Sequence, residues 1–256
     1  MTDVILETRS LTKEFKGFVA VNHVDLKVRR GHIHALIGPN GAGKTTFFNL
    51  LTKFLQPTTG SILFNGADIT FEKPAETARR GIVRSFQISA VFPHMTVLEN
   101  VRAALQRNLG TSFHFWKAES TLIHLHDRAR QLLADVDLQD FADEMTVNLP
   151  YGRKRALELA TTLALEPELM LLDEPTQGMG HEDVDRVTQL IKKVSNGRTI
   201  LMVEHNMNVV SSIADRITVL QRGAIIADGP YAEVSRNPLV IEAYMGTVDT
   251  ELQGAH

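Results

Sequence analysis

A glycine-rich segment sets the strongest limit on the fold of this chain: residues 38–45 are Gly38-Pro39-Asn40-Gly41-Ala42-Gly43-Lys44-Thr45. The apolar run at 32–37 predicts a buried strand before it, and residues 46–52 predict the start of a helix after it. Glycines at such a junction let backbone N–H groups turn inward around an anion, where a Cβ atom would obstruct them. The helix would direct its positive N-terminal end at the same anion. The pattern predicts a phosphate-binding loop; the alternative is a glycine-rich turn that binds nothing.

Two side chains at the end of the segment indicate which anion binds. Lys44 is expected to place its ammonium on the β- and γ-phosphates of a nucleoside triphosphate, and the Thr45 hydroxyl is expected to be a Mg²⁺ ligand. The predicted nucleotide contacts in this segment are Gly38, Pro39, Asn40, Gly41, Ala42, Gly43, Lys44, Thr45 and Thr46.

Composition limits the remaining classes of protein. A chain of 256 residues can form one α/β domain with an inserted lobe. The net charge of −3 gives no reason to expect a nucleic-acid partner, and the absence of cysteine excludes disulfides and thiolate metal sites. Acidic residues within the first seven positions argue against a leader, and no apolar run approaches the ~18 residues of a membrane span. We therefore expect any membrane role to come through a partner.

The spacing of apolar residues changes along the chain. Short alternating runs within residues 4–37 predict a small antiparallel sheet ahead of the loop, and residues 61–66 add one more strand and turn. The first helix is expected to end near Leu55. Helical spacing replaces alternation between about 93 and 166, which predicts an inserted helical lobe.

The last third of the chain returns to strands. The continuous apolar runs at 169–172 and 199–203 suit parallel strands covered on both faces. Residues 216–227 predict a hairpin, and a short helix is expected around 240–244. The predicted domain spans 4–246, with a core of about 4–90 and 165–246, a helical subdomain of about 91–164 and a flexible tail at 247–256.

Two adjacent carboxylates follow the apolar run at 169–172. Asp173, at the end of a buried strand, is expected to hold Mg²⁺. Glu174 is the candidate to orient and deprotonate the attacking water. Paired carboxylates at a strand end can also be helix caps, and Pro175 makes a local turn plausible. The phosphate-binding loop favours the catalytic interpretation.

Three further elements follow in order. The first is Gln87, at the end of the segment 83–87. The second is the segment 149–153 (Leu-Pro-Tyr-Gly-Arg), which opens an amphipathic helix. The third is His205, which directly follows the predicted strand at 201–204. With the loop and the carboxylates, this ordered set resembles the ATP-binding cassette (ABC) ATPases over nearly the whole chain. The resemblance implies an α/β P-loop NTPase fold with a RecA-like core, an N-terminal antiparallel β subdomain and an inserted α-helical subdomain, and it implies hydrolysis of ATP with Mg²⁺.

A finer resemblance is to cassettes of the branched-chain (hydrophobic) amino acid uptake family. It rests on Leu-Pro-Tyr-Gly at 149–152, Gly-Met-Gly-His-Glu at 178–182, and the ending at 238–246. This resemblance implies an ATPase subunit that powers the uptake of such amino acids through separate membrane subunits. Related cassettes serve urea, amides or aromatic acids, so the solute stays open.

The resemblance also implies how the site is completed. Two cassettes close head-to-tail around two ATP molecules, so the Gly152 amide and Arg153 of one would contact the nucleotide of the other. His205 would contact the γ-phosphate, although a lone histidine at a strand end is more often structural. Gln87 would join the Mg²⁺ and water shell, with a surface glutamine as the alternative. Phe15 would stack on adenine, and Phe18 is a competitor for that place.

The sequence departs from the usual family pattern at two positions. Pro150 stands where a serine is usual and has neither a hydroxyl nor an N–H to donate, although it could preorganise the first helical turn. Gly180 stands where a small polar or acidic residue usually links the two sites of the dimer. Coupling between the sites would then fall to a backbone group or to His181.

Partners follow from the resemblance as well. They are a second cassette (an identical copy or a sister protein), membrane permease subunits and, indirectly, a solute-binding protein, so the chain is expected at the cytoplasmic face of the membrane. Apolar residues that are expected to receive a permease helix, or to pack the lobe, are Ile88, Ala90, Val91, Phe92 and Met95. A non-transport cassette would normally show tandem cassettes or coiled-coil insertions, and a small-molecule kinase or GTPase would not explain 149–158.

Overall fold

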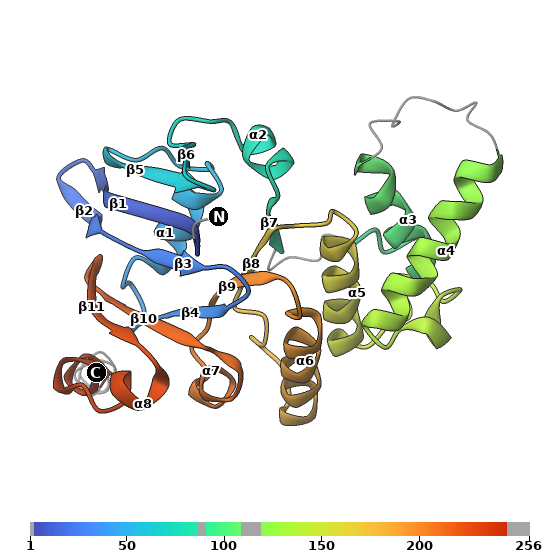
Figure 1. Cartoon of the computed structure of the whole chain (residues 1–256). Coiled ribbons are helices and arrows are strands. Elements are labelled where there is room, and N and C mark those ends of the chain that lie inside the picture. The colour runs from blue at the N-terminus through green and yellow to red at the C-terminus, as the bar shows by residue number, and fades with distance from the viewer. Residues whose placement is uncertain (1–2, 86–90, 109–118, 245–256) are drawn as a thin grey trace.

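The computed structural model describes residues 3–85, 91–108 and 119–244, and it contains two β-sheets with helices around them (Figure 1). The N-terminal sheet is antiparallel throughout, in the order β2-β1-β5-β6, with β3 paired to β1. Its strands are β1 (Val4–Phe15), β2 (Phe18–Val24), β3 (Lys27–Arg29), β5 (Thr59–Phe64) and β6 (Ala67–Asp68). This sheet confirms the prediction of an antiparallel unit ahead of and just after the phosphate-binding loop.

The central sheet has the order β11-β10-β4-β9-β8-β7. Its strands are β4 (Ile33–Ile37), β7 (Ile82–Ser85), β8 (Leu169–Asp173), β9 (Thr199–Val203), β10 (Arg216–Gln221) and β11 (Ala224–Gly229). All pairings are parallel except that of β10 with β11, a hairpin whose turn residues Arg222 and Gly223 have φ of 48° and 80°. Strands β4, β8 and β9 are buried along their whole length, as the continuous apolar runs predict.

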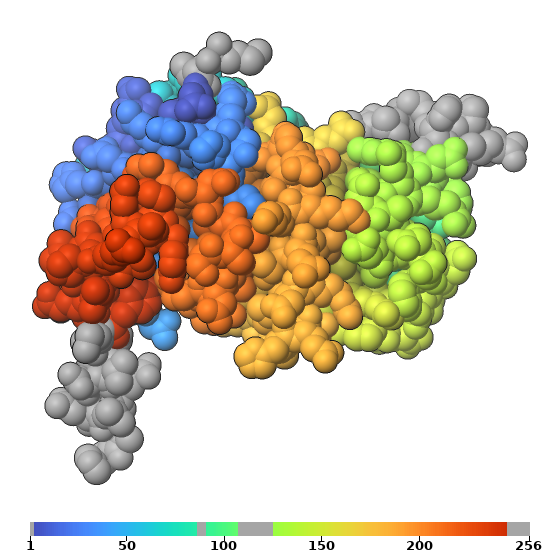
Figure 2. Space-filling model, turned by 60° about the horizontal axis from the view of Figure 1, so that its bottom comes forward, coloured from blue at the N-terminus to red at the C-terminus, as the bar shows by residue number. Residues whose placement is uncertain are grey.

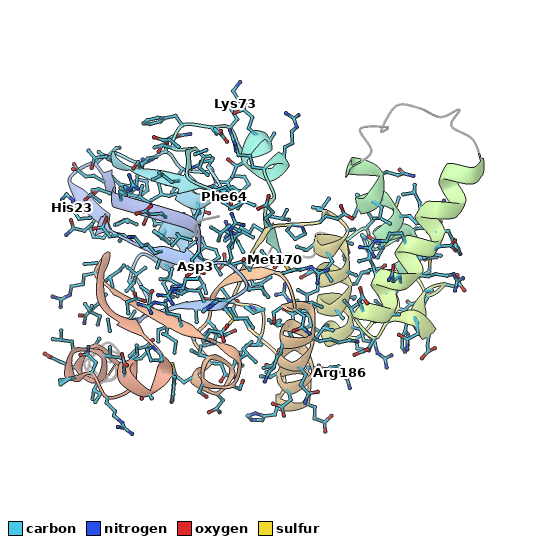
Figure 3. All side chains as sticks on the ribbon, in the orientation of Figure 1. Asp3, His23, Phe64, Lys73, Met170 and Arg186 are labelled. Atoms are coloured by element: carbon cyan, nitrogen blue, oxygen red, sulfur yellow. The ribbon has the colours of Figure 1, made fainter. Side chains whose placement is uncertain are left out.

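The central sheet separates two hydrophobic cores. On one face, Leu36 and Leu171 pack with Phe47 and Phe48 of α1 (Lys44–Leu51) and with the N-terminal sheet. On the other face, Met170 packs with α6 (His181–Val194) and α7 (Met207–Ile213). Figure 3 shows Met170 at the centre of the molecule and Arg186 beside α6.

The inserted region is helical, as its spacing predicts. It contains α3 (Val97–Asn108), α4 (Glu119–Asp135), η1 (Gln139–Phe141), η2 (Thr146–Asn148) and α5 (Tyr151–Leu163). Asn100 is buried and its amide donates to Phe92 O, Thr96 O and Thr146 Oγ1, which joins both ends of the insertion. Figure 2 shows α3 and α4 gathered at one side of the molecule.

The smaller helices lie at the margins. They are α2 (Pro74–Arg79) before β7 and α8 (Tyr231–Val234) after β11, and the backbone is again helical over 238–244. Residues 247–256 lie outside the described residues. Within the described ranges, none of the helices combines the length and the hydropathy that a bilayer-spanning segment needs.

The first helix ends at Leu51 rather than near Leu55, and the residue after its C-cap is strained. Lys53 has a left-handed φ of 64° and is 4% exposed, and its ammonium has no hydrogen-bond partner among the described residues. The pKa of Lys53 falls from 10.5 to about 8 because burial disfavours the charged amine. The carboxylates of Glu72 and Asp68 raise the pKa, but their effect is smaller than that of burial. The helix end therefore carries both a backbone cost and a charge cost.

Replacing Lys53 is expected to stabilise the protein. A pKa that falls from 10.5 to about 8 corresponds to about 3 kcal/mol lost on folding while the amine is charged. The unfolded chain binds the proton more tightly, so this cost is complete below pH 8 and is relieved as the pH rises from 8 to 10.5. Denaturant titrations should show Lys53→Met more stable than wild type at pH 7, with a smaller gap at pH 9.5. A gap that is independent of pH would contradict the charge cost.

Candidate functional site

The phosphate-binding loop joins β4 to α1, as predicted, and its glycines are required by its shape. Gly38, Gly41 and Gly43 have φ of 149°, 76° and 100°. A Cβ atom on Gly38 would lie 2.1 Å from Leu220 O, and one on Gly43 would lie 2.3 Å from Ala20 O. The loop is thus held between the β10–β11 hairpin and β2, with the exposed Thr45 in the first turn of α1.

Lys44 folds back over its own loop. Its ammonium donates to Gly38 O at 2.6 Å and to Pro39 O at 3.0 Å, and the residue is buried. Burial lowers the pKa of Lys44, whereas the carboxylates of Glu174 and Asp173 raise it. Because β4 and β8 both pair in parallel with β9, the loop after β4 and the carboxylates at the end of β8 lie at the same edge of the central sheet.

The two carboxylates differ in their surroundings. Asp173 is the last residue of β8 and is 5% exposed. Glu174 follows it with a left-handed φ of 47°, and its amide donates to Val203 O at 2.9 Å. A non-glycine residue in this conformation is strained, and such strain collects at functional positions. The turn after β8 thus holds Glu174 at the carboxyl end of the central sheet, where open α/β sheets bind ligands.

Arg84 was not among the predicted site residues, yet it contacts this site from β7. Its guanidinium forms an ion pair with Asp173 and also donates to Asn49 Oδ1 of α1 at 2.7 Å. The Arg84 side chain is 13% exposed. A buried charge requires a partner, so an arginine within the strand before Gln87 was the signal that could have identified it.

His205 is the second residue after β9, next to Glu204, a carboxylate that sequence reasoning also missed. Glu204 is fully buried and accepts hydrogen bonds from Thr176 Oγ1 (2.9 Å), from His205 N (2.9 Å) and from Asn206 N (3.0 Å). The His205 ring is 56% exposed, with Nδ1 3.6 Å from Glu204 Oε1. Two of the candidate catalytic residues therefore stand at neighbouring strand ends, Glu174 after β8 and His205 after β9.

Residues 149–153 start α5, which β7 and β8 separate from α1 in the view of Figure 1. Pro150 is the N-cap, one position before the first helical residue. A Cβ atom on Gly152 would lie 2.4 Å from Asp183 Oδ1 of α6, so a larger residue here would displace the Asp183 side chain. The Arg153 guanidinium lies 3.7 Å from the centroid of the Phe141 ring. In the single chain, the Arg153 guanidinium therefore makes a cation–π contact with Phe141.

The remaining predicted residues lie elsewhere. Phe15, 42% exposed at the end of β1, pairs with Phe18 of β2, which is 67% exposed. The Lys13 ammonium lies 5.0 Å from the Phe15 ring centroid. Gln87, Ile88 and Ala90 lie outside the described residues, so their predicted roles stay predictions.

Comparisons with known proteins agree with this geometry. A family model described as ABC transporter matches residues 21–177, and a model of the branched-chain amino acid ATP-binding cassette transporter matches residues 224–250. The chain is 40% identical over 253 residues to the high-affinity branched-chain amino acid transport ATP-binding protein BraF of Pseudomonas aeruginosa, covering 96% of this chain and 99% of that protein. It is 38% identical over 256 residues to LivG of Escherichia coli strain K12, described in the same words, with the same shares covered.

Solved structures show the same fold. The crystal structure of MJ1267, an ATP-binding cassette of an ABC transporter in its ADP conformation, matches with a TM-score of 0.83 and 30% identity. The match covers 96% of this chain and all (100%) of that one. The predicted fold class and the resemblance to ABC ATPases are therefore confirmed. The chain belongs to the ABC transporter family, as an ATP-binding subunit that hydrolyses ATP.

Proposed function

We propose that this chain powers an importer for branched-chain or related hydrophobic amino acids. The observation that carries the proposal is near-full-length similarity to BraF and LivG, together with the match of residues 224–250 to the branched-chain amino acid model. The cassette would work at the cytoplasmic face of the membrane with permease subunits and, through them, a solute-binding protein. Import of urea, an amide or an aromatic acid is the alternative.

Within the cassette, the proposed roles follow the geometry. The loop amides of 38–46 and the Lys44 ammonium would hold the triphosphate, and Phe15 would stack on the base. Glu174 would take the proton from the attacking water, while His205 and Gln87 orient that water beside the γ-phosphate. These roles are carried by the shared position of the loop, Asp173 and Glu174 at one edge of the sheet.

The donor set at this edge fits a magnesium ion. The Thr45 hydroxyl and the Asp173 carboxylate are the hard oxygen ligands that Mg²⁺ prefers, and Gln87 would add an amide oxygen. Bound Mg²⁺ would neutralise charge that develops on the phosphates. Arg84 contacts Oδ2 of Asp173, and the carboxylate would hold the cation through water.

A second cassette would complete the site. The Gly152 amide at the start of α5 would reach the γ-phosphate held by the partner, because a helix N-terminus is an anion-binding site. Arg153 would have to leave the Phe141 ring to add its charge. We further propose that residues 4–246 act as one ATPase domain in which 91–164 carry this contact.

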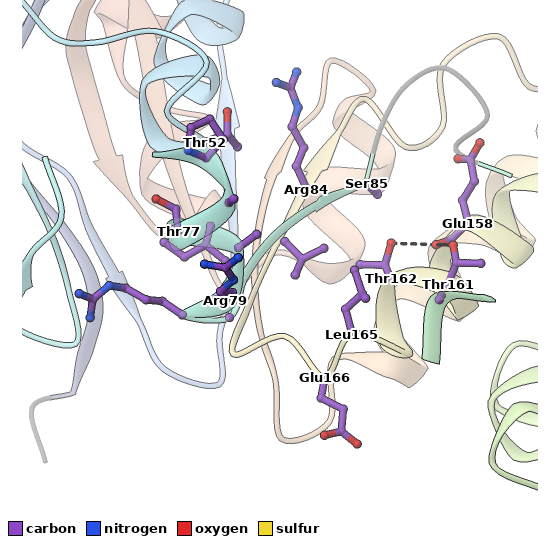
Figure 4. A pocket seen from close by; sticks show the side chains of 18 of the residues that line it. Thr52, Thr77, Arg79, Arg84, Ser85, Glu158, Thr161, Thr162, Leu165 and Glu166 are labelled. Atoms are coloured by element: carbon purple, nitrogen blue, oxygen red, sulfur yellow. Dashed lines mark hydrogen bonds between the residues drawn. The ribbon is translucent and has the colours of Figure 1, made fainter. Parts of the chain in front are cut away.

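The permease would dock in a groove of about 1130 Å³ beside β7. Figure 4 shows it between α2 and β7 on one side and the C-terminal end of α5 on the other. Phe54 and Phe92 line the groove, and both are more than half exposed. This groove at the junction of sheet and helical lobe combines apolar and charged lining residues, which suits a short amphipathic helix from a permease.

Capture of the tagged chain from its own membranes tests the partners. We expect permease subunits to co-purify with wild type and with Leu239→Arg, an equally exposed apolar residue outside the groove, but not with Phe92→Arg. Vesicles that contain the captured complex should take up labelled leucine or valine with ATP, and a Glu174→Gln complex should not. Uptake of urea or an aromatic acid alone would support the alternative solute, and no co-purifying membrane protein would contradict the transport role.

A further inference from the structure

Glu204 has a buried carboxyl group to which the proposed mechanism assigns no role. Its side chain is 0% exposed, and an ionised carboxylate in such a place requires compensation by hydrogen bonds or opposite charge. Oε1 accepts both backbone amides of His205 and Asn206, and Oε2 accepts the hydroxyl of Thr176. Three donors from two separate segments thus converge on one buried group.

The two segments are those that bear the candidate catalytic side chains. Thr176 lies two residues beyond Glu174, in a turn closed by the Gln177 amide on Glu174 O at 3.1 Å. His205 and Asn206 directly follow Glu204 in the segment after β9. Glu204 therefore bridges the ends of β8 and β9 through side-chain hydrogen bonds, in addition to the backbone bond from Glu174 N to Val203 O.

The same carboxylate also faces the His205 ring. Glu204 Oε1 lies 3.6 Å from Nδ1, whereas more than half of the His205 side chain is open to solvent. A carboxylate oxygen at this distance attracts the polar edge of the ring and so favours one ring orientation. Glu204 thus acts on the imidazole and on the main chain that carries it.

We propose that Glu204 is a positioning residue, which holds the turn of Glu174 and the ring of His205 in one arrangement around the attacking water. The proposal rests on the roles proposed above for Glu174 and His205. Since the bridge runs through the Thr176 hydroxyl, removing that hydroxyl should loosen one segment relative to the other. Misplacement by about 1 Å can reduce turnover by about 10²-fold without weakening substrate binding.

The test changes each of the two residues that form the hydrogen bond between the segments, Thr176 and Glu204. Thr176→Val is expected to lower kcat for ATP about tenfold or more with little change in KM, and Thr176→Ser should restore it. Glu204→Gln keeps the shape and an acceptor for the two amides but removes the charge, so it should lower kcat and also shift the ring ¹⁵N resonances of His205. The control is Thr188→Val, which removes a similarly buried hydroxyl whose bond to Val184 O stays within α6.

NMR signals of His205 in the nucleotide-free protein test the bridge without depending on ATP hydrolysis, and so independently of the proposed function. Thr176→Val should move the backbone and ring signals of His205, and Thr188→Val should leave them unchanged. Unmoved signals would overturn the bridge. Moved signals with unchanged kcat would overturn the positioning role if Glu174→Gln is inactive. Full activity of Glu174→Gln would instead refute the proposed catalytic roles, and with them the role of Glu204.

Discussion

Replacing Glu174 with glutamine is expected to slow ATP hydrolysis by ~10²–10⁴-fold while ATP still binds, the usual scale for loss of a general base. Glutamine keeps the size of the side chain but cannot take a proton from water. It also leaves Lys44, the loop amides and Asp173 in place, so binding should be retained. Phosphate release and binding of a fluorescent ATP analogue would measure the two effects separately.

The matched control for Glu174→Gln is Asp185→Asn, which removes one negative charge from the exposed side of α6. This control should hydrolyse ATP like wild type. Turnover of Glu174→Gln within about tenfold of wild type would assign the base to another residue. Loss of ATP binding in the same variant would show that Glu174 acts in binding rather than in proton transfer.

Gly38→Ala is expected to unfold the phosphate-binding loop. The new Cβ would lie 2.1 Å from Leu220 O, and the φ of 149° is unfavourable for alanine. Because the obstructing atom is backbone, either β10 or the loop must move, and we expect a loss of about 3 kcal/mol or more in the free energy of unfolding. Denaturant titration and ATP binding would measure it, and both should be impaired.

Gly41→Ala distinguishes the effect of the steric clash on stability from the effect of a positive φ. Gly41 also has a positive φ, 76°, but its added Cβ would meet nothing within 4 Å. We expect it to cost only about 1 kcal/mol, the penalty for a left-handed alanine. Equal destabilisation by the two alanines would show that the contact with Leu220 does not determine the shape of the loop.

Local patterns predicted most of the fold because their causes are local. The phosphate-binding loop follows from fixed spacing between a buried strand and a helix, and the runs at 169–172 and 199–203 follow from burial on both faces. The predicted end of the first helix, near Leu55, was wrong by four residues. The chain leaves α1 at Leu51 and turns at Lys53, a residue type that rarely adopts the left-handed conformation and so gives no stop signal.

The contacts that sequence reasoning missed join distant segments. Arg84 and Asp173 are brought together only by the pairing of β7 with β8. Glu204 appears in the sequence as one more polar residue after an apolar run, whereas the structure buries it and gives it the Thr176 hydroxyl from the end of β8. Such pairs depend on strand order, which local periodicity does not encode.

Light scattering of the Glu174→Gln chain tests most directly whether ATP lies between two cassettes. It should be measured alone and together with the cassette that co-purifies from its membranes, with and without saturating ATP and Mg²⁺. We expect the mass of two cassettes with ATP and of one without it. A single cassette at saturating ATP in both preparations would contradict the account.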